Sequence, residues 1–167
     1  PGDTLPTALA RHHIELPDEQ IQPLQRYCEL VWEWNEKLNL TRHTTFEKFV
    51  ARDLVDTRAL SPFIGFGDRV IDVGTGGGVP GIPLAIQRPD WQVVCVDSNH
   101  KKIAFVTQAA IELKLSNVEA RATRVEDFAP AAPFDVVISR AFSDLASFAQ
   151  SSARHVAPGG VLAAMKG

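Results

Sequence analysis

The sequence is poor in cysteine and contains no long hydrophobic run. Its two cysteines, Cys28 and Cys95, stand in apolar patterns, so we expect two small buried side chains in a reducing environment rather than a disulfide or a metal pair. No apolar segment approaches the roughly 18 residues that span a bilayer. These features disfavour a disulfide-rich secreted domain and a membrane-spanning protein, and they predict a cytoplasmic protein.

Positive charge is not in excess, because 17 Lys and Arg stand against 20 Asp and Glu, for a net charge of −3 at pH 7. A nucleic-acid-binding domain generally carries a basic patch or stripe. Any RNA-binding surface must therefore be local. The sequence also has no cluster of metal ligands and no obvious acid–base pair or catalytic triad, so we expect no metal ion.

The length of 167 residues suits one hydrophobic core better than two. Apolar residues three or four positions apart predict an amphipathic helix over residues 18–38 and a second helix over 45–60, with a shorter one near 4–13. We therefore expect an N-terminal helical region over 1–60 and a ligand-binding domain over 61–167. Together they should form one compact unit and a monomer.

From Arg69 onward the pattern changes to strands and helices in alternation. The predicted strands are 69–73, 92–97, 118–122, 135–139 and 160–165. The predicted helices between them are 81–88, 99–115 and 143–156. Short apolar strands separated by helices predict an α/β fold with a doubly wound, mostly parallel Rossmann-like sheet, in the strand order 3-2-1-4-5.

The segment from Val70 to Gly78 is the most informative part of the chain. An apolar strand that carries one acidic residue, Asp72, runs directly into a turn with Gly74, Gly76 and Gly78. Glycine tolerates positive φ and has no Cβ, so a ligand can lie against the bare backbone of such a turn. Ligands of parallel sheets bind at the carboxyl ends of the strands, which is where this turn lies.

Two classes of nucleoside ligand use such a turn. A dinucleotide fingerprint, G-x-G-x-x-G, is matched at Gly76, Gly78 and Gly81. The pattern apolar-apolar-Asp-apolar-Gly-x-Gly-x-Gly instead resembles the first motif of the S-adenosylmethionine-dependent methyltransferases. A carboxylate at Asp72 is unfavourable beside a diphosphate, whereas a ligand with a cationic amino-acid end tolerates it. S-adenosylmethionine is therefore the predicted cofactor, and a plain tight turn without a nucleotide is the remaining alternative.

Two further segments complete the predicted cofactor site. Asp97 ends the second strand, where a carboxylate can accept hydrogen bonds from both ribose hydroxyls or can simply cap the following helix. After the third strand, Val125 could cover an adenine ring, beside Glu126. The predicted cofactor-binding residues are Asp72, Gly74, Thr75, Gly76, Gly78, Asp97, Ser98, Val125, Glu126 and Arg140.

The fourth strand ends in Ser139-Arg140-Ala141-Phe142. This segment has neither the Pro-Pro-aromatic motif of methyltransferases that act on adenine amino groups nor the reactive cysteine that a pyrimidine ring carbon requires. Arg140 and Phe142 can stack on a nucleobase or hydrogen-bond to it. Arg140 could equally be a surface ion-pair partner.

Seven short motifs, taken together, carry a resemblance that no glycine pattern carries alone. They are Trp34-Asn35 with Asn39-Leu40-Thr41, Arg52-x3-Asp56, Asp72-Val73-Gly74-Thr75-Gly76, Pro80-Gly81-Ile82-Pro83-Leu84-Ala85, Asp97-Ser98, Arg124-Val125-Glu126 and Ser139-Arg140-Ala141-Phe142. Through these motifs the chain, over roughly residues 20–167, resembles the bacterial small-subunit rRNA guanine-N7 methyltransferases, the RsmG (GidB) family.

The resemblance implies methyl transfer from S-adenosylmethionine to N7 of a guanine in 16S rRNA, with the rRNA or a 30S assembly intermediate as partner. Guanine N7 carries a free lone pair, so in-line displacement needs no general base. Arg140 would then be the catalytic residue only in the sense that it positions the base. The residues that the resemblance assigns to RNA or substrate are Asn39, Arg52, Lys101, Arg124 and Phe142.

The chain departs from the family pattern in two places. Asp53 stands where the family usually has histidine, on the inner side of the predicted 45–60 helix, where it would repel RNA phosphate or bind Arg52. The family fold also continues past Gly167, so we expect its C-terminal strands to be missing and the fifth strand to be an open edge.

Three other functions remain open from the sequence. The first is a methyltransferase for another substrate, such as a small molecule. The second is an NAD(P)-linked oxidoreductase, which Asp72 and the lack of a hydride-transfer set disfavour. The third is a catalytically weak nucleoside- or RNA-binding module.

Overall fold

The computed structural model describes residues 2–65, 67–139 and 145–165. These residues form a five-stranded sheet in the order β3-β2-β1-β4-β5, and every neighbouring pair of strands is parallel. The strands are β1 (Arg69–Val73), β2 (Gln92–Asp97), β3 (Val118–Ala122), β4 (Phe134–Ser139) and β5 (Val156–Ala164). The doubly wound parallel fold and its strand order, predicted from the alternation of strands and helices, are confirmed.

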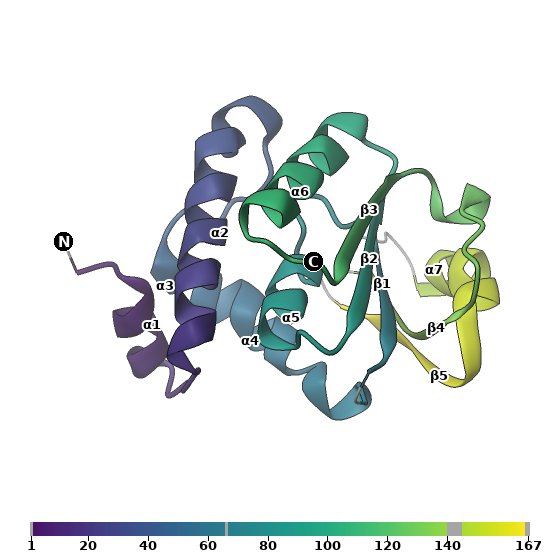
Figure 1. The fold of residues 1–167 in the computed structure, drawn as a ribbon, viewed down its shortest axis with the longest axis horizontal. Helices are drawn as coiled ribbons and strands as arrows, with labels where there is room; N and C mark the ends of the chain where they lie inside the picture. The colour runs from purple at the N-terminus through teal and green to yellow at the C-terminus, as the bar shows by residue number, and fades with distance from the viewer. Residues whose placement is uncertain (1, 66, 140–144, 166–167) are drawn as a thin grey trace.

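Helices cover both faces of the sheet (Figure 1). On one face, α5 (Gly81–Gln87) and α6 (His100–Glu112) pack against β2 and β3. On the other face, α7 (Leu145–Ser152) packs against β5. Central strands of such a sheet are buried on both sides, which is why β1 is apolar from Val70 to Val73 apart from Asp72.

The N-terminal helices form an outer layer on α5 and α6. Helix α2 (Asp18–Leu38) lies across them, with α1 (Leu5–Arg11) beside it, and α2 has the bounds that the apolar spacing predicted. One hydrophobic cluster runs without interruption from Leu5 in α1 to Ile138 in β4. The helical region and the sheet therefore share a core, and the division of the chain near residue 60 stays a prediction.

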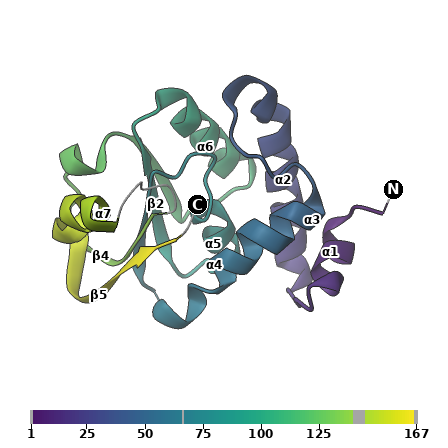
Figure 2. The same cartoon turned by 180° about the vertical axis from the view of Figure 1, so that it is seen from behind.

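The predicted helix over 45–60 is not one continuous α-helix. It consists of α3 (Phe46–Lys48), a π-helical segment (Phe49–Leu54) and α4 (Val55–Arg58), which together run from α1 toward the sheet (Figure 2). The π-helical segment buries Phe49, Val50 and Leu54, and it buries Asp53 with them. The sequence has no proline or glycine here that would indicate a change of helix type. Since π-helical segments are frequent at functional sites, this one is a candidate for ligand contacts.

Two predicted elements near the C-terminus differ from the structure. Strand β5 starts at Val156, four residues before the predicted start, because Pro158 and Gly159 lie inside it rather than in a preceding turn. Proline is tolerated at an edge strand, and β5 is an edge strand of the described sheet. The predicted 143–156 helix is the shorter α7, followed by a 3-10 turn at Ala153–His155. No helix among residues 2–65, 67–139 and 145–165 is long and apolar enough to cross a membrane.

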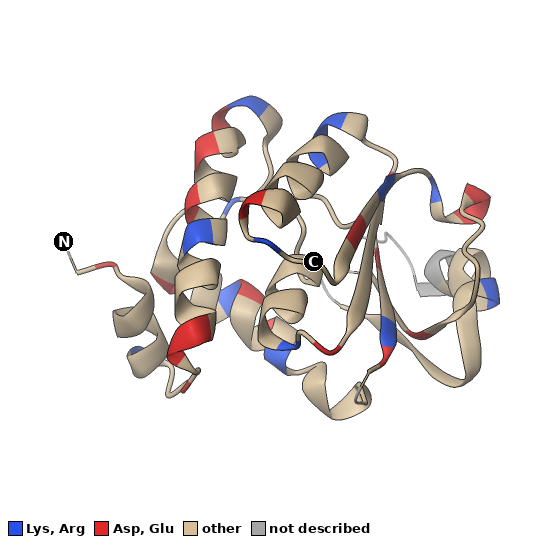
Figure 3. Ribbon diagram, viewed as in Figure 1, with Lys and Arg blue, Asp and Glu red and all other residues tan. Residues whose placement is uncertain are grey.

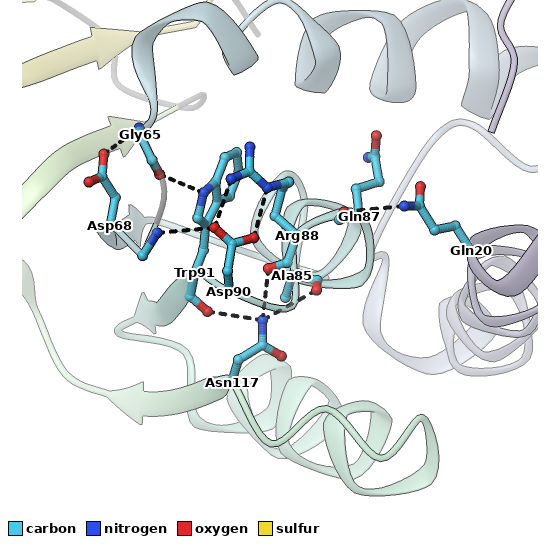
Figure 4. A network of polar contacts seen from close by, with 10 residues as sticks. Gln20, Gly65, Asp68, Ala85, Gln87, Arg88, Asp90, Trp91 and Asn117 are labelled. Atoms are coloured by element: carbon cyan, nitrogen blue, oxygen red, sulfur yellow. Dashed lines mark hydrogen bonds and ion pairs between the residues drawn. The ribbon is translucent and has the colours of Figure 1, made fainter. Parts of the chain in front are cut away.

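A polar network fixes the edge of the sheet where β1, β2 and β3 begin (Figure 4). The Asn117 side-chain amide donates to the backbone carbonyls of Ala85, Arg88 and Trp91, at 3.0–3.2 Å. Arg88 pairs with Asp90 at 2.7 Å, and this guanidinium lowers the pKa of Asp90 to about 2. The network holds α5 against β2 and β3, and it leaves the opposite edge of the sheet for the candidate site.

Candidate functional site

The turn after β1 depends on glycine at three positions. Gly74, Gly76 and Gly78 have φ values of 70°, 57° and 96°, a region in which side-chain-bearing residues are strained. At Gly78 an added Cβ would also lie only 2.8 Å from the Ile82 side chain. The glycine pattern therefore encodes a backbone shape, as the sequence suggested.

Asp72 lies completely buried beneath this turn. Its Oδ2 accepts hydrogen bonds from the Thr75 hydroxyl at 2.6 Å and from the Gly81 amide at 2.9 Å. The packing around Gly81 is so close that an added Cβ would lie 2.5 Å from Cys95 Sγ. The Asp72 carboxylate thus acts inside the protein. It stabilises the glycine turn through Thr75 and accepts a backbone amide at the start of α5 through Gly81. It does not line the surface on which a cofactor would lie.

Most backbone amides of the turn already have acceptors within the protein. A diphosphate would need amides of the turn and of the following helix N-terminus as donors. Here the acceptors are Val96 O for Gly74 and Thr75, Asp97 Oδ2 for Gly76, Thr75 O for Gly78 and Val79, and Asp72 Oδ2 for Gly81. This hydrogen bonding argues against a dinucleotide, on grounds that the motif alone could not provide.

Asp97 at the end of β2 is arranged to take hydroxyl groups. Its Oδ2 accepts from the Gly76 amide and its Oδ1 from the Asn99 amide, both at 2.9 Å. Each carboxylate oxygen can accept two hydrogen bonds, so one further acceptor site remains on each oxygen among the described residues. The carboxylate is half-buried, and a ribose with two adjacent hydroxyls fits this pair of sites. Asp97 thus supports the start of α6 and also lines a cavity beside the glycine turn.

A cavity of about 180 Å³ lies beside Asp97. It brings together five of the predicted cofactor residues, from β1, β2 and the loop after β3. These are Gly74, Asp97, Ser98, Val125 and Glu126, together with Val73, Val96, Thr123 and Arg124. Val125 is buried, as expected of an apolar residue that covers a ring. Glu126 is exposed, and its ion pair with Arg124 lowers its pKa.

The loop that carries Val125 is held by two residues that the sequence did not reveal. Arg154 donates through Nη2 to the backbone carbonyls of Val125, Glu126 and Phe128, at 3.0, 2.7 and 2.6 Å. The buried His155 has Nε2 2.9 Å from the Val125 carbonyl oxygen. Because these contacts join residues 26 to 30 positions apart, no local motif could have indicated them.

A second, larger cavity of about 570 Å³ lies on the other side of the turn. Its walls come from α2, the loop at 40–43, the π-helical segment and the glycine turn from Gly74 to Gly77. The Tyr27 hydroxyl of α2 donates to the Gly77 carbonyl at 2.7 Å and so ties the outer helix to the turn. Asp53 lines this cavity and pairs with His43, a partner that the sequence did not suggest.

The residues predicted to contact RNA are placed at the surface. Asn39, Arg52, Lys101 and Arg124 are all exposed. Asn39 ends α2 with a φ of 51° and therefore also serves as the helix C-cap. Arg140 and Phe142, predicted to hold the target base, lie outside the described residues. Within the described ranges, no group of three or more His, Cys, Asp or Glu is placed to hold a metal ion.

The strand order, the glycine turn after β1 and the carboxylate at the end of β2 are those of a Rossmann-like fold. The same fold occurs in coclaurine N-methyltransferase, solved with N-methylheliamine and S-adenosylhomocysteine, which has a TM-score of 0.65 and 15% identity and covers 95% of this chain and 55% of that one. An S-adenosylmethionine-dependent methyltransferase from Thiobacillus denitrificans, solved with S-adenosylhomocysteine, has a TM-score of 0.56 and 18% identity and covers 65% of this chain and 46% of that one.

The chain belongs to the GidB family, rRNA small subunit methyltransferase G, whose family model matches residues 20–167. The Ribosomal RNA small subunit methyltransferase G of Chromobacterium violaceum is 45% identical over 163 residues, which cover 98% of this chain and 78% of that protein. Its counterpart in Laribacter hongkongensis is 44% identical over 165 residues, covering 99% and 79%. The family predicted from the seven motifs is confirmed.

Proposed function

We propose that this protein transfers a methyl group from S-adenosylmethionine to N7 of a guanine in 16S rRNA. Membership of a family of small-subunit rRNA methyltransferases supports the substrate class. The observation that best supports this cofactor is the arrangement of Asp97 beside a glycine turn. Most backbone amides of that turn already donate to acceptors within the protein. This arrangement favours a neutral ribose with two hydroxyls over a diphosphate.

The chain's own residues would hold the cofactor in separate parts. Asp97 accepts hydrogen bonds from the ribose hydroxyls, Val125 and its loop cover the adenine, and the bare turn from Gly74 to Gly76 allows close approach of the backbone. When bound, S-adenosylmethionine supplies a methyl group that its sulfonium already activates. The smaller cavity fits the nucleoside, because it combines an acceptor pair with an apolar wall at Val125.

The reaction asks for positioning rather than for acid–base chemistry. Guanine N7 is unprotonated at neutral pH and needs no general base. Holding the nitrogen, the methyl group and the sulfur in line at contact distance can supply roughly 7–11 kcal/mol of the barrier. Arg140 and Phe142, which follow β4 in the sequence, are proposed to hold the base, and neither has to exchange a proton.

Residues 42–58 offer a surface for RNA. Their four cations, Arg42, Lys48, Arg52 and Arg58, are exposed. Of the three acids in this segment, Glu47 binds Arg11 and His12, Asp53 is buried against His43, and Asp56 is half-buried. The concern that Asp53 would repel phosphate is thereby reduced, because its charge does not face the solvent. Helix α2, by contrast, has more acidic than basic residues along its length (Figure 3).

A methyl-transfer assay tests the proposal. Purified protein is incubated with methyl-labelled S-adenosylmethionine and either 30S subunits or naked 16S rRNA from cells that lack the modification. The RNA is then digested and its nucleosides are identified by mass spectrometry. We expect N7-methylguanosine at one site in 16S rRNA, and loss of the product with Arg140→Ala. Label in another nucleoside, or only in added small metabolites, would overturn the proposal. The two RNA substrates decide between free rRNA and an assembly intermediate as partner.

A further inference from the structure

The larger cavity beside the glycine turn contains a buried carboxylate held by a histidine. Asp53 is 5% exposed, and both of its carboxylate oxygens lie 3.1 Å from His43 Nδ1. The surrounding wall combines apolar and aromatic residues, among them Tyr27, Val31 and Phe49, with the polar residues Thr41 and Arg42. Burying a carboxylate in such surroundings costs free energy unless other groups compensate it. An apolar cavity with a few converging polar groups is typical of a small-molecule subsite.

The histidine of this pair is fixed before any ligand arrives. The His43 amide donates to the Thr41 hydroxyl at 2.9 Å, and the His43 carbonyl accepts from Trp32 Nε1 at 3.0 Å. The Thr41 amide in turn donates to the Asn35 side chain at 2.9 Å. The loop is thus tied to α2 at two points, Trp32 and Asn35, and is braced internally by Thr41. A ligand that meets a preorganised pair does not have to order it, which favours binding.

The location of the pair points to one particular part of the cofactor. Gly74 lines both cavities, so they adjoin at the turn, with Asp97 on one side and Asp53 on the other. A group attached to a nucleoside that is bound at Asp97 can extend across the turn into the larger cavity. In S-adenosylmethionine that extension carries an α-ammonium and an α-carboxylate. Asp72 is fully buried and engaged by Thr75 and Gly81, so it does not line either cavity as a counter-charge.

We propose that Asp53, oriented by His43, binds the α-ammonium group of S-adenosylmethionine in the larger cavity. A carboxylate that accepts from an ammonium forms a charge-assisted hydrogen bond, which is stronger than a neutral one. His43 acts as a positioning residue for this contact. The inference rests on the proposed use of S-adenosylmethionine, and it assigns a role to a residue that departs from the usual family pattern.

Two ligands that differ only at the amino-acid end test the assignment. S-adenosylhomocysteine has the complete extension, whereas 5′-methylthioadenosine has the same nucleoside and sulfur but no amino acid. Calorimetry would measure both on the wild type and on Asp53→Asn, His43→Gln, Asp97→Asn and Asp56→Asn. We expect Asp53→Asn to weaken the binding of S-adenosylhomocysteine by about tenfold to a hundredfold and to leave the affinity for methylthioadenosine nearly unchanged. His43→Gln should give a smaller loss in the same direction.

The two control variants separate the possible outcomes. Asp97→Asn should weaken the binding of both ligands, because it removes charge at the nucleoside. Asp56→Asn, outside the cavity, should leave both affinities unchanged. If Asp53→Asn weakens both ligands equally, or neither, the assignment is overturned while the proposed function stands. If the wild type binds neither ligand, the proposed function itself fails. Should Asp53→Asn not fold, the wild type can be tested with an S-adenosylhomocysteine analogue that lacks the α-amino group. It should bind about tenfold to a hundredfold more weakly than S-adenosylhomocysteine, and equal affinity would contradict the assignment.

Discussion

Two carboxylates at the ends of neighbouring strands do different work because they are buried to different degrees. Asp72 has no exposed surface, and its Oδ2 organises the glycine turn through Thr75 and Gly81. Asp97 is half-buried and lines the smaller cavity. Two separate sequence motifs contain these residues and do not distinguish their roles. Their burial in the fold does.

Replacement of Asp72 by alanine should therefore damage stability before it damages binding. It removes the acceptor of two buried donors, each worth roughly 1–3 kcal/mol when left unpaired, so we expect a loss of about 2–4 kcal/mol in the free energy of unfolding. Urea denaturation monitored by circular dichroism would measure it. Asp97→Ala is the matched variant and should lose much less stability. Equal stability of Asp72→Ala and wild type would contradict the role assigned to Asp72.

Gly81 offers a second test at the scale of single residues. An added Cβ would lie 2.5 Å from Cys95 Sγ and 3.0 Å from Asp72 Oδ2, inside the contact between β1, β2 and α5. Gly81→Ala should destabilise the protein by about 1–3 kcal/mol through overpacking, seen as a lower thermal midpoint. Gly2→Ala serves as the control, since nothing lies within 4 Å of its added Cβ. A Gly81→Ala protein as stable as wild type would show that the turn can relax.

At the scale of elements, the loop over the smaller cavity depends on the 3-10 turn after α7. Arg154 donates hydrogen bonds to three carbonyls of that loop. Arg154→Gln should therefore let Val125 move and should weaken the binding of S-adenosylhomocysteine by about tenfold. Arg121→Gln is the control, because its ion pair with Glu119 is between side chains that are 59% and 52% exposed and contributes little. Calorimetry that gives the same Kd for Arg154→Gln and wild type would refute this role.

The connection between α5 and β2 predicts a dependence of stability on pH. Arg88 lowers the pKa of Asp90 to about 2, below the value of about 3.9 expected in the unfolded chain. The pair therefore stabilises the fold fully above about pH 4 and loses this contribution as the pH falls toward 2. We expect Asp90→Asn to be about 1–2 kcal/mol less stable than wild type at pH 7, with the difference shrinking between pH 4 and pH 2. Denaturation curves across this range would show it, and a constant difference would be inconsistent with the pairing.

Some elements were predictable from the sequence for a clear physical reason. The bounds of β1, β2, β3 and α2 agree with the apolar patterns, since a strand buried on both faces or a helix with one buried stripe leaves a strong local signal. The π-helical segment and the early start of β5 leave no such signal. In the same way, motifs predicted roles for Asp97 and Val125, but Arg154 and Tyr27 act through partners distant in the sequence. Only the folded chain brings those partners together.

At the scale of the whole molecule, charge is arranged by surface rather than by total. The net charge is −3, yet the exposed cations of residues 42–58 lie on a segment whose acids include the buried Asp53 and the paired Glu47. An acidic protein can therefore present RNA with a local basic surface. This surface and the larger cavity share Arg42 and the π-helical segment, in which Arg52 is exposed and Asp53 lines the cavity.

This arrangement predicts that RNA binding and cofactor binding can be separated by mutation. Arg52→Gln and Lys48→Gln should each raise KM for 30S subunits and lower the salt dependence of RNA binding by about one counterion, while Kd for S-adenosylhomocysteine stays unchanged. Lys37→Gln, on the acidic helix α2, is the control and should leave both quantities as they are. A loss of cofactor affinity in Arg52→Gln would contradict the separation.

The turn after Val73 and the carboxylate of Asp97 are proposed to bind a sulfonium nucleoside and not a dinucleotide. Calorimetry of the purified protein with S-adenosylhomocysteine and with NADH tests this most directly, with Asp97→Asn beside the wild type. We expect one equivalent of S-adenosylhomocysteine to bind the wild type, a large loss of affinity in Asp97→Asn, and no binding of NADH. Binding of NADH, or binding of S-adenosylhomocysteine that is indifferent to Asp97→Asn, would contradict the account.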